Sequence, residues 1–145
     1  MIMASKAQQY LHIQCSAYAL LIDAEYIEEV VNVADSVVKA ETFQWRSKDI
    51  PLVDLCELLT GTAAKNQRDC LILKFQPDID ADYQYLAIAV EAVHNIKAIK
   101  ESEFSNIPNL AFPSNDYFDR AYMHTETQQC IYRLRKSAFI SFLAE

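Results

Sequence analysis

The sequence has 145 residues, of which 52% are hydrophobic and 23% charged, so a single domain over residues 1–145 with its own core is expected. Its formal net charge of -7 argues against a nucleic-acid partner, because binding DNA or RNA requires a basic surface. No apolar run approaches the roughly 20 residues that span a membrane, and the N-terminal stretch MIMASKAQQY lacks the apolar centre of a signal peptide. We therefore expect a cytoplasmic protein without an integral membrane segment.

The first predicted element is a strand over residues 9–15, where alternate side chains are apolar. Residues 17–22 are more continuously apolar and predict its hairpin partner, with Ser16 at the turn. The acidic stretch 23–30 is compatible with a helical turn, whereas residues 30–33 favour a strand. Both assignments stay open for this segment.

The stretch TFQWRSKDIPLVDLCELLTG, residues 42–61, predicts a strand, a charged turn over residues 46–49, a second strand and a short helix. Pro51 cannot donate a backbone hydrogen bond, which places the second strand at a sheet edge or starts it near Pro51. Asp54 and Glu57 match the start of a capped helix, and Gly61 stands where a left-handed C-terminal cap belongs.

The second half of the chain predicts further short strands separated by polar turns. The acidic segment 76–82 and the proline-containing segment 102–115 are expected to be loops, and 91–99 fits a strand or a short helix. The expected strands, terminal hairpin and apolar C-terminal segment are 69–75, 83–90, 117–124 with 130–134, and 137–143. Each half of the chain thus has a strand pair, a crossing segment, a second hairpin and a terminal segment, which indicates two small barrels.

The order of these elements resembles the CheW-like family, the adaptor domain of bacterial chemotaxis arrays. The resemblance runs from about residue 8 to residue 143 and is carried mainly by WRSKDIPLVDLCELL, and also by the opening QYLHIQCSAYALLIDAEYIEEVV and by YLAIAVEAVHNIKAI. It implies a mostly β, CheW-like fold of two small five-stranded β-barrel lobes packed side by side with short helices. The lobes would be intertwined, one over roughly residues 20–80 and the other over the remainder. Family members usually have glycine after the turn arginine, where this sequence has Ser47.

The resemblance also implies sites. Arg46 would lie near the groove between the lobes, where a chemoreceptor-like helical hairpin docks, with Trp45 and Lys48 beside it. The alternation of Trp45 with Phe43 also allows the indole to face the barrel interior, and Lys48 also fits a simple turn residue. Glu28 and Glu29 would contact the regulatory domain of a CheA-like histidine kinase. Arginine and tryptophan are enriched in binding hot spots, which supports the assignment of Arg46 and Trp45 to a docking surface.

One further candidate comes from charge alone. Arg133, Arg135 and Lys136 form a basic cluster in an acidic chain, and Arg133 and Arg135 share a face if the segment is extended. We therefore predict that Arg133 and Arg135 bind an acidic protein surface.

No pattern supports catalysis, a metal site or a cofactor, so no enzyme is expected. The four cysteines form no CxxC pair and are expected to be buried thiols. Asp54 is assigned to helix capping instead of catalysis. The three histidines, His12, His94 and His124, lack metal-ligand spacing, and with one glycine in the chain no phosphate-binding loop is available.

The function predicted is a non-catalytic signal-transduction adaptor that couples a receptor-like helical partner to a histidine-kinase regulatory domain. Two alternatives stay open: an accessory regulator of a pilus, motility or other signalling system with the same fold, and a β-barrel that binds a small ligand. Exposed sheet edges would also permit weak self-association.

Overall fold

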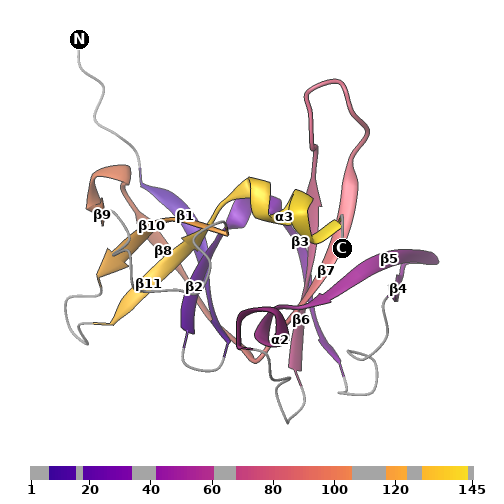
Figure 1. Ribbon diagram of the computed structural model, residues 1–145, viewed down its shortest axis with the longest axis horizontal. Helices are drawn as coiled ribbons and strands as arrows, with labels where there is room; N and C mark the ends of the chain where they lie inside the picture. The colour runs from indigo at the N-terminus through magenta and orange to yellow at the C-terminus, as the bar shows by residue number, and fades with distance from the viewer. Residues whose placement is uncertain are drawn as a thin grey trace.

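The computed structural model describes residues 7–15, 18–33, 42–60, 68–105, 117–123 and 129–143. They form two curled sheets that stand side by side, with two short α-helices between them (Figure 1). The predicted positions Ser16, Gly61 and His124 lie outside the described residues. The strands of the six-stranded sheet are β1 (Gln8–Cys15), β2 (Tyr18–Asp23), β8 (Ala92–Ile99), β9 (Phe104–Ser105), β10 (Phe118–Met123) and β11 (Cys130–Leu134).

The strands of the five-stranded sheet are β3 (Ile27–Val33), β4 (Thr42–Trp45), β5 (Lys48–Asp54), β6 (Arg68–Phe75) and β7 (Gln84–Val90). The α-helices are α2 (Leu55–Thr60) and α3 (Lys136–Leu143), and two 3-10 turns are η1 (Ala24–Tyr26) and η2 (Glu101–Glu103). The fold is therefore mostly β, with two lobes and short helices as predicted. The first lobe has six strands because β9, a two-residue strand, extends its edge.

The two sheets repeat one topology, and the five-stranded sheet, built from the consecutive strands β3 to β7, is inserted between the strands of the six-stranded sheet along the chain. The strand order is β8-β1-β2-β11-β10-β9 in one sheet and β3-β6-β7-β5-β4 in the other. After the β1–β2 hairpin the chain crosses over and β3 pairs with β6, and after the β6–β7 hairpin it crosses back and β8 pairs with β1. In both lobes the second hairpin joins through a parallel pair, β5 with β7 and β11 with β2. This repeated topology explains why the two halves of the sequence predict the same order of elements.

Three groups of buried side chains fill the molecule. The largest lies between the sheets and includes Ile13, Leu71 and Phe139. A second, with Trp45 and Ile50, fills the interior of the five-stranded lobe, and a third, with Tyr10 and Phe104, fills the other lobe. Strands with a core on both faces carry the continuous apolar runs seen in the sequence.

Helix α3 joins the two lobes through one aromatic side chain. The Phe139 ring, 1% exposed, lies with its centroid 5.7 Å from that of Tyr26 and 5.7 Å from that of Phe75. Tyr26 belongs to η1 and Phe75 ends β6, so this contact connects the C-terminal helix of one lobe to the other lobe. The sequence predicted an apolar segment here, and its structure is helical from Lys136.

Local chemistry explains the step from β5 to α2. Asp54 Oδ1 accepts a hydrogen bond of 3.2 Å from the Glu57 backbone N–H, the capping role predicted for it. Pro51 is the last residue of β5 that pairs with β4, and Leu52 is the first that pairs with β7. The missing N–H of Pro51 therefore falls where β5 changes partner. β5 lies between two strands, so the expectation of an edge strand was wrong for the strand as a whole.

Other differences from the sequence prediction are local. The charged turn has two residues, Arg46 and Ser47, and Lys48 already belongs to β5. Residues 91–99 form a strand from Ala92, and residues 24–33 use both options, a 3-10 turn followed by a strand. The predicted loop at 102–115 includes the end of η2 and β9, and its residues 106–116 lie outside the described part.

The cysteines behave mostly as predicted. Cys15, Cys56 and Cys70 are buried free thiols, and Cys130 is half-buried. Burial raises the pKa of the Cys70 thiol to about 12, and a hydrogen bond with Cys56, together with burial, raises the pKa of Cys15. These thiols are therefore protonated at neutral pH and suited to packing.

Candidate functional site

The β4–β5 hairpin presents Arg46 at its tip on a strained backbone. Trp45 pairs with Lys48 across the hairpin, and the two residues between them have φ angles of 49° (Arg46) and 66° (Ser47). Positive φ at both central positions is the geometry of a type I′ turn, which favours Asn-Gly. An arginine and a serine in this conformation carry a local conformational cost, and such strain often occurs at functional positions.

Three of the predicted site residues meet at this tip: Glu29, Trp45 and Arg46. The indole Nε1 of Trp45 donates a 2.7 Å hydrogen bond to Glu29 Oε2, and Arg46 Nη2 lies 3.5 Å from the same oxygen. The Arg46 guanidinium carbon lies 4.6 Å from the centroid of the Trp45 ring, in cation–π geometry. We call this group the Glu29–Trp45–Arg46 cluster.

Within the cluster the exposure differs in a way that fits docking. Trp45 is 7% exposed and packs on the interior of its lobe, as the alternation with Phe43 allowed. The Arg46 side chain is 63% exposed and that of Glu29 38%. The buried indole holds the carboxylate, and the carboxylate and ring together orient an arginine that remains accessible to a partner.

Lys48 extends the cluster along the sheet. Its Nζ lies 5.1 Å from the centroid of the Tyr85 ring, which in turn lies 5.2 Å from the Trp45 ring. Lys74 Nζ lies 4.7 Å from the Tyr83 centroid and 6.0 Å from that of Tyr85. Lys74, Tyr83 and Tyr85 were not among the predicted site residues. The only sequence signal for them is the two-residue spacing of Tyr83 and Tyr85, which places both on one face of a strand.

Glu28 lies at a β-bulge of β3. The register of β3 with β6 shifts between Ile27 and Glu29, which leaves Glu28 as the extra residue. Glu28 is exposed and lines a pocket of about 380 Å³ with Glu25, Tyr26, Lys74, Phe75, Gln76, Tyr83 and Lys136. The two adjacent glutamates thus contact different neighbours in the same lobe.

Arg133 lies at the centre of an internal network in the six-stranded lobe. Its guanidinium donates 2.9 Å hydrogen bonds to both carboxylate oxygens of Asp119, a 2.8 Å bond to Glu101 and a 3.1 Å bond to the Tyr10 hydroxyl. It also lies 4.4 Å from the centroid of the Phe104 ring. The side chain is 14% exposed, so two carboxylates neutralise most of its charge inside the lobe.

This network shifts the acidity of its members. Burial by itself lowers the pKa of Arg133, but the hydrogen bonds to Asp119, Glu101 and Tyr10 outweigh it and raise that pKa well above its ordinary value. The hydrogen bond from Arg133 lowers the pKa of Glu101. Arg133 therefore stabilises the lobe as a permanent cation.

Arg135 does not share a strand face with Arg133, because β11 ends at Leu134. Its Nη2 donates a 2.9 Å hydrogen bond to the Phe118 carbonyl, and its backbone N–H donates to the Tyr117 carbonyl. The expectation of one extended face with both arginines was wrong. A contact of either residue with a protein partner stays a prediction.

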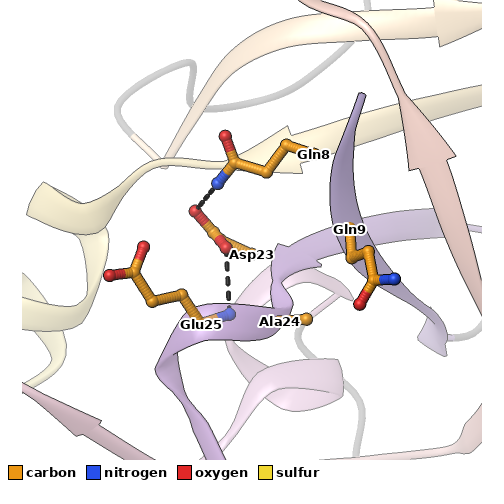
Figure 2. Close-up of a pocket in the computed structure, with 5 residues that line it drawn as sticks. All are labelled: Gln8, Gln9, Asp23, Ala24 and Glu25. Carbon is orange, nitrogen blue, oxygen red and sulfur yellow. Dashed lines mark hydrogen bonds between the residues drawn. The ribbon is translucent and has the colours of Figure 1, made fainter. Parts of the chain in front are cut away.

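A small-ligand barrel would need an open interior with converging polar groups. The interiors of both lobes are instead packed with buried apolar side chains. Figure 2 shows another pocket of about 490 Å³, at the rim of the six-stranded sheet, lined by Gln8, Gln9, Asp23, Ala24 and Glu25. Asp23 accepts hydrogen bonds there from the Gln8 side chain and the Glu25 backbone N–H. Neither observation favours a small ligand.

The part of the chain that the structure describes contains no cluster of metal ligands and no membrane-spanning helix. No group of three or more His, Cys, Asp or Glu side chains in this part of the chain could hold a metal ion. The rings of His12 and His94 lie 4.7 Å apart between centroids, where the register of β1 with β8 shifts between Leu11 and Ile13. No helix within the described ranges is long and apolar enough to cross a membrane.

Comparison with known proteins identifies the family. The CheW-like domain matches residues 9–131. The chain belongs to the CheW-like domain family. A search of curated proteins found no match. Among solved structures, the scaffolding protein TtCheW from Thermoanaerobacter tengcongensis is similar, with a TM-score of 0.70 and 15% sequence identity over 90% of this chain and 85% of that one.

This CheW-like chain keeps the family's scaffold fold despite the low identity with TtCheW, which shows likeness in fold alone. On this fold, the Glu29–Trp45–Arg46 cluster is a group of side chains that orient one another and leave Arg46 exposed at the surface.

Proposed function

We propose that this CheW-like chain is a non-catalytic adaptor that binds a chemoreceptor-like helical hairpin and the regulatory domain of a CheA-like histidine kinase at the same time. The observation that carries the proposal is the Glu29–Trp45–Arg46 cluster. The resemblance to the family named these residues from separate segments, and β3 and the β4–β5 hairpin bring them within hydrogen-bond and ion-pair distance.

The cluster has the physical properties of a binding hot spot. Arg46 is exposed, yet its guanidinium is oriented by the indole and the Glu29 carboxylate, so less side-chain entropy is lost when a partner binds. A planar guanidinium can offer two parallel N–H donors to a partner carboxylate. Arginine beside tryptophan is a frequent composition of such sites.

The partners would use different surfaces of one two-lobed domain. In this proposal Arg46, Trp45 and Lys48 contact the receptor-like hairpin, and Glu28 and Glu29 contribute to the kinase side. Because Glu29 holds both Trp45 and Arg46, a shift in one partner can alter the presentation of the residues that face the other. Signal would pass in the cytoplasm as a change in relative geometry, with no reaction in this chain.

The test is a pull-down from native cell lysate with wild type and an Arg46→Glu variant, with captured proteins identified by mass spectrometry. Arg120→Glu is the matched control, because Arg120 is an exposed arginine of β10 in the other lobe. We expect wild type and control to capture a receptor or histidine kinase, and Arg46→Glu to reduce that capture at least about tenfold.

Two results would count against the proposal. Equal capture by all three proteins would remove the role of Arg46. Capture of pilus or other motility proteins without any receptor or kinase would replace the receptor–kinase assignment by that of an accessory regulator.

A further inference from the structure

Cations and aromatic rings alternate along one end of the five-stranded lobe. The row consists of Arg46, Trp45, Lys48, Tyr85, Lys74 and Tyr83, which we call the cation–aromatic row. Trp45 pairs with Lys48 across β4 and β5, and Lys74 pairs with Tyr85 across β6 and β7. Directly paired residues point to the same face of a sheet, so the row crosses neighbouring strands on one face.

The row is accessible and its lysines keep their charge available. Lys48 is exposed, Lys74 is half-buried, and Tyr83 is 56% exposed. Among the described residues, neither lysine of the row lies within ion-pair distance of a carboxylate, in contrast to Arg46 and Arg133. Both lysines instead lie over tyrosine rings, a contact that orients an ammonium group without neutralising it.

The positive row stands out on a chain with a net charge of -7. Acidic residues of η1 and β3 border it. Glu29 pairs with Arg46, and Glu25 and Glu28 line a pocket with Lys74 and Tyr83. A ligand that complements this surface therefore needs negative charge along a short line, together with apolar groups that can pack on exposed ring faces.

We propose that the cation–aromatic row binds an acidic segment of a partner protein. Along the curled sheet, β4 and β6 are three strand spacings apart, a path of about 14 Å at ~4.8 Å each, and the straight distance is shorter because the sheet curls until Glu29 of β3 reaches Trp45 of β4. An acidic helix of about 10 residues, at ~1.5 Å per residue, is therefore long enough to cover the row. The inference rests on the proposed adaptor function, and it states that one of the partners carries an acidic segment.

A protein segment fits this surface better than a nucleic acid does. Nucleic-acid binding draws its affinity from many phosphate contacts over a broad basic footprint. Here the cations form a narrow row bordered by glutamates, in a strongly acidic chain. A peptide can place a few carboxylates against the lysines and leave neutral residues opposite the glutamates.

The test uses Trp45, the one tryptophan of the chain, as a fluorescent reporter inside the row. The probe is a synthetic peptide of about 12 residues with glutamate at every fourth position and alanine elsewhere, so that as a helix it spans the row with its carboxylates on one face. A matched peptide with glutamine in place of glutamate measures the part of binding that does not depend on charge. We expect a saturable change in Trp45 emission with the acidic peptide only, and weaker binding as salt is added.

The test protein is the double variant Lys48→Gln/Lys74→Gln. Its control is the double variant Lys97→Gln/Lys100→Gln, which removes the same charge from the β8 end of the other lobe. We expect the dissociation constant to rise about fivefold for the test protein, from two exposed ion pairs, and to stay unchanged for the control. Unaltered thermal unfolding of both double variants verifies that they fold.

In the fluorescence titration, three outcomes would overturn the inference: no saturable response by wild type, equal weakening of binding in both double variants, or tighter binding of an oligothymidine of the same charge. The proposed adaptor function is tested separately by the pull-down. If the Lys48→Gln/Lys74→Gln variant still captured a receptor or kinase as well as wild type, the adaptor function would stand and this inference would fail.

Discussion

Arg46 shows how one backbone conformation and two neighbouring groups give a surface residue a fixed direction. A two-residue turn with φ of 49° and 66° places it at the tip of the hairpin, and Glu29 and the Trp45 ring hold the guanidinium. Arg133 has a similar set of partners, but its carboxylates come from Asp119 and Glu101 and surround it at 14% exposure. Both residues carry the same charge, but the exposed side chain of Arg46 is suited to docking, whereas the mostly buried side chain of Arg133 stabilises its lobe.

The strain at Ser47 can be measured. A non-glycine residue in the left-handed region costs about 1–2 kcal/mol, partly offset by the lower chain entropy of serine in the unfolded state. We expect Ser47→Gly to increase the free energy of unfolding by about 1 kcal/mol. Urea denaturation of wild type and variant gives this difference. Ser105→Gly, at an exposed strand position, is the control and should be neutral or destabilising; a loss of stability in Ser47→Gly would contradict the strained turn.

At the level of elements, the crossing strands β3 and β8 determine which residues can meet. β3 crosses into the five-stranded lobe and pairs with β6, with a bulge at Glu28, and Glu28 lines a pocket with Lys74 and Tyr83. Glu29 of the same strand reaches Trp45. Helix α3 returns from the other lobe and closes the interface between the lobes with Phe139.

Truncation of Phe139 tests the role of α3. Phe139→Ala removes a ring that is 1% exposed and packs on Tyr26 and Phe75, so we expect a loss of about 3–5 kcal/mol in the free energy of unfolding. Ile140→Ala, on the same helix at 39% exposure, is the control and should cost less than about 1 kcal/mol. Denaturant unfolding measures both variants, and similar losses would contradict the assignment of Phe139 as the contact between lobes.

At the scale of the whole molecule, a short sequence forms two lobes of the same topology, each with its own sheet. The five-stranded lobe runs without interruption from β3 to β7, and the six-stranded lobe takes the strands before and after it. The apolar side chains between the sheets, Phe139 among them, join the two lobes, which suits a scaffold that holds two partners at a defined distance.

The alternation of residues 9–15, the cap at Asp54 and the charged turn made the strands, α2 and the hairpin predictable, because these features depend on local sequence. The contacts between distant residues were less accessible. Asp119 and Glu101 neutralise Arg133 only through strand register and the η2 turn, which no local pattern reveals. The same holds for the cation–aromatic row, since Lys74 and Tyr85 meet through the β6–β7 register. Family resemblance, more than local pattern, brought Glu29 and Arg46 into one hypothesis.

The most direct test of the adaptor function is whether one molecule of this chain holds both partners at once. Tagged wild-type protein would be captured from native lysate and the eluate captured again through an antibody to the co-purified histidine kinase. We predict that the second eluate contains the receptor-like protein together with this chain, and that with Arg46→Glu the receptor-like protein is lost from it while this chain remains. A second eluate with kinase and this chain but no receptor, from lysate in which the first capture contained both, would contradict simultaneous binding.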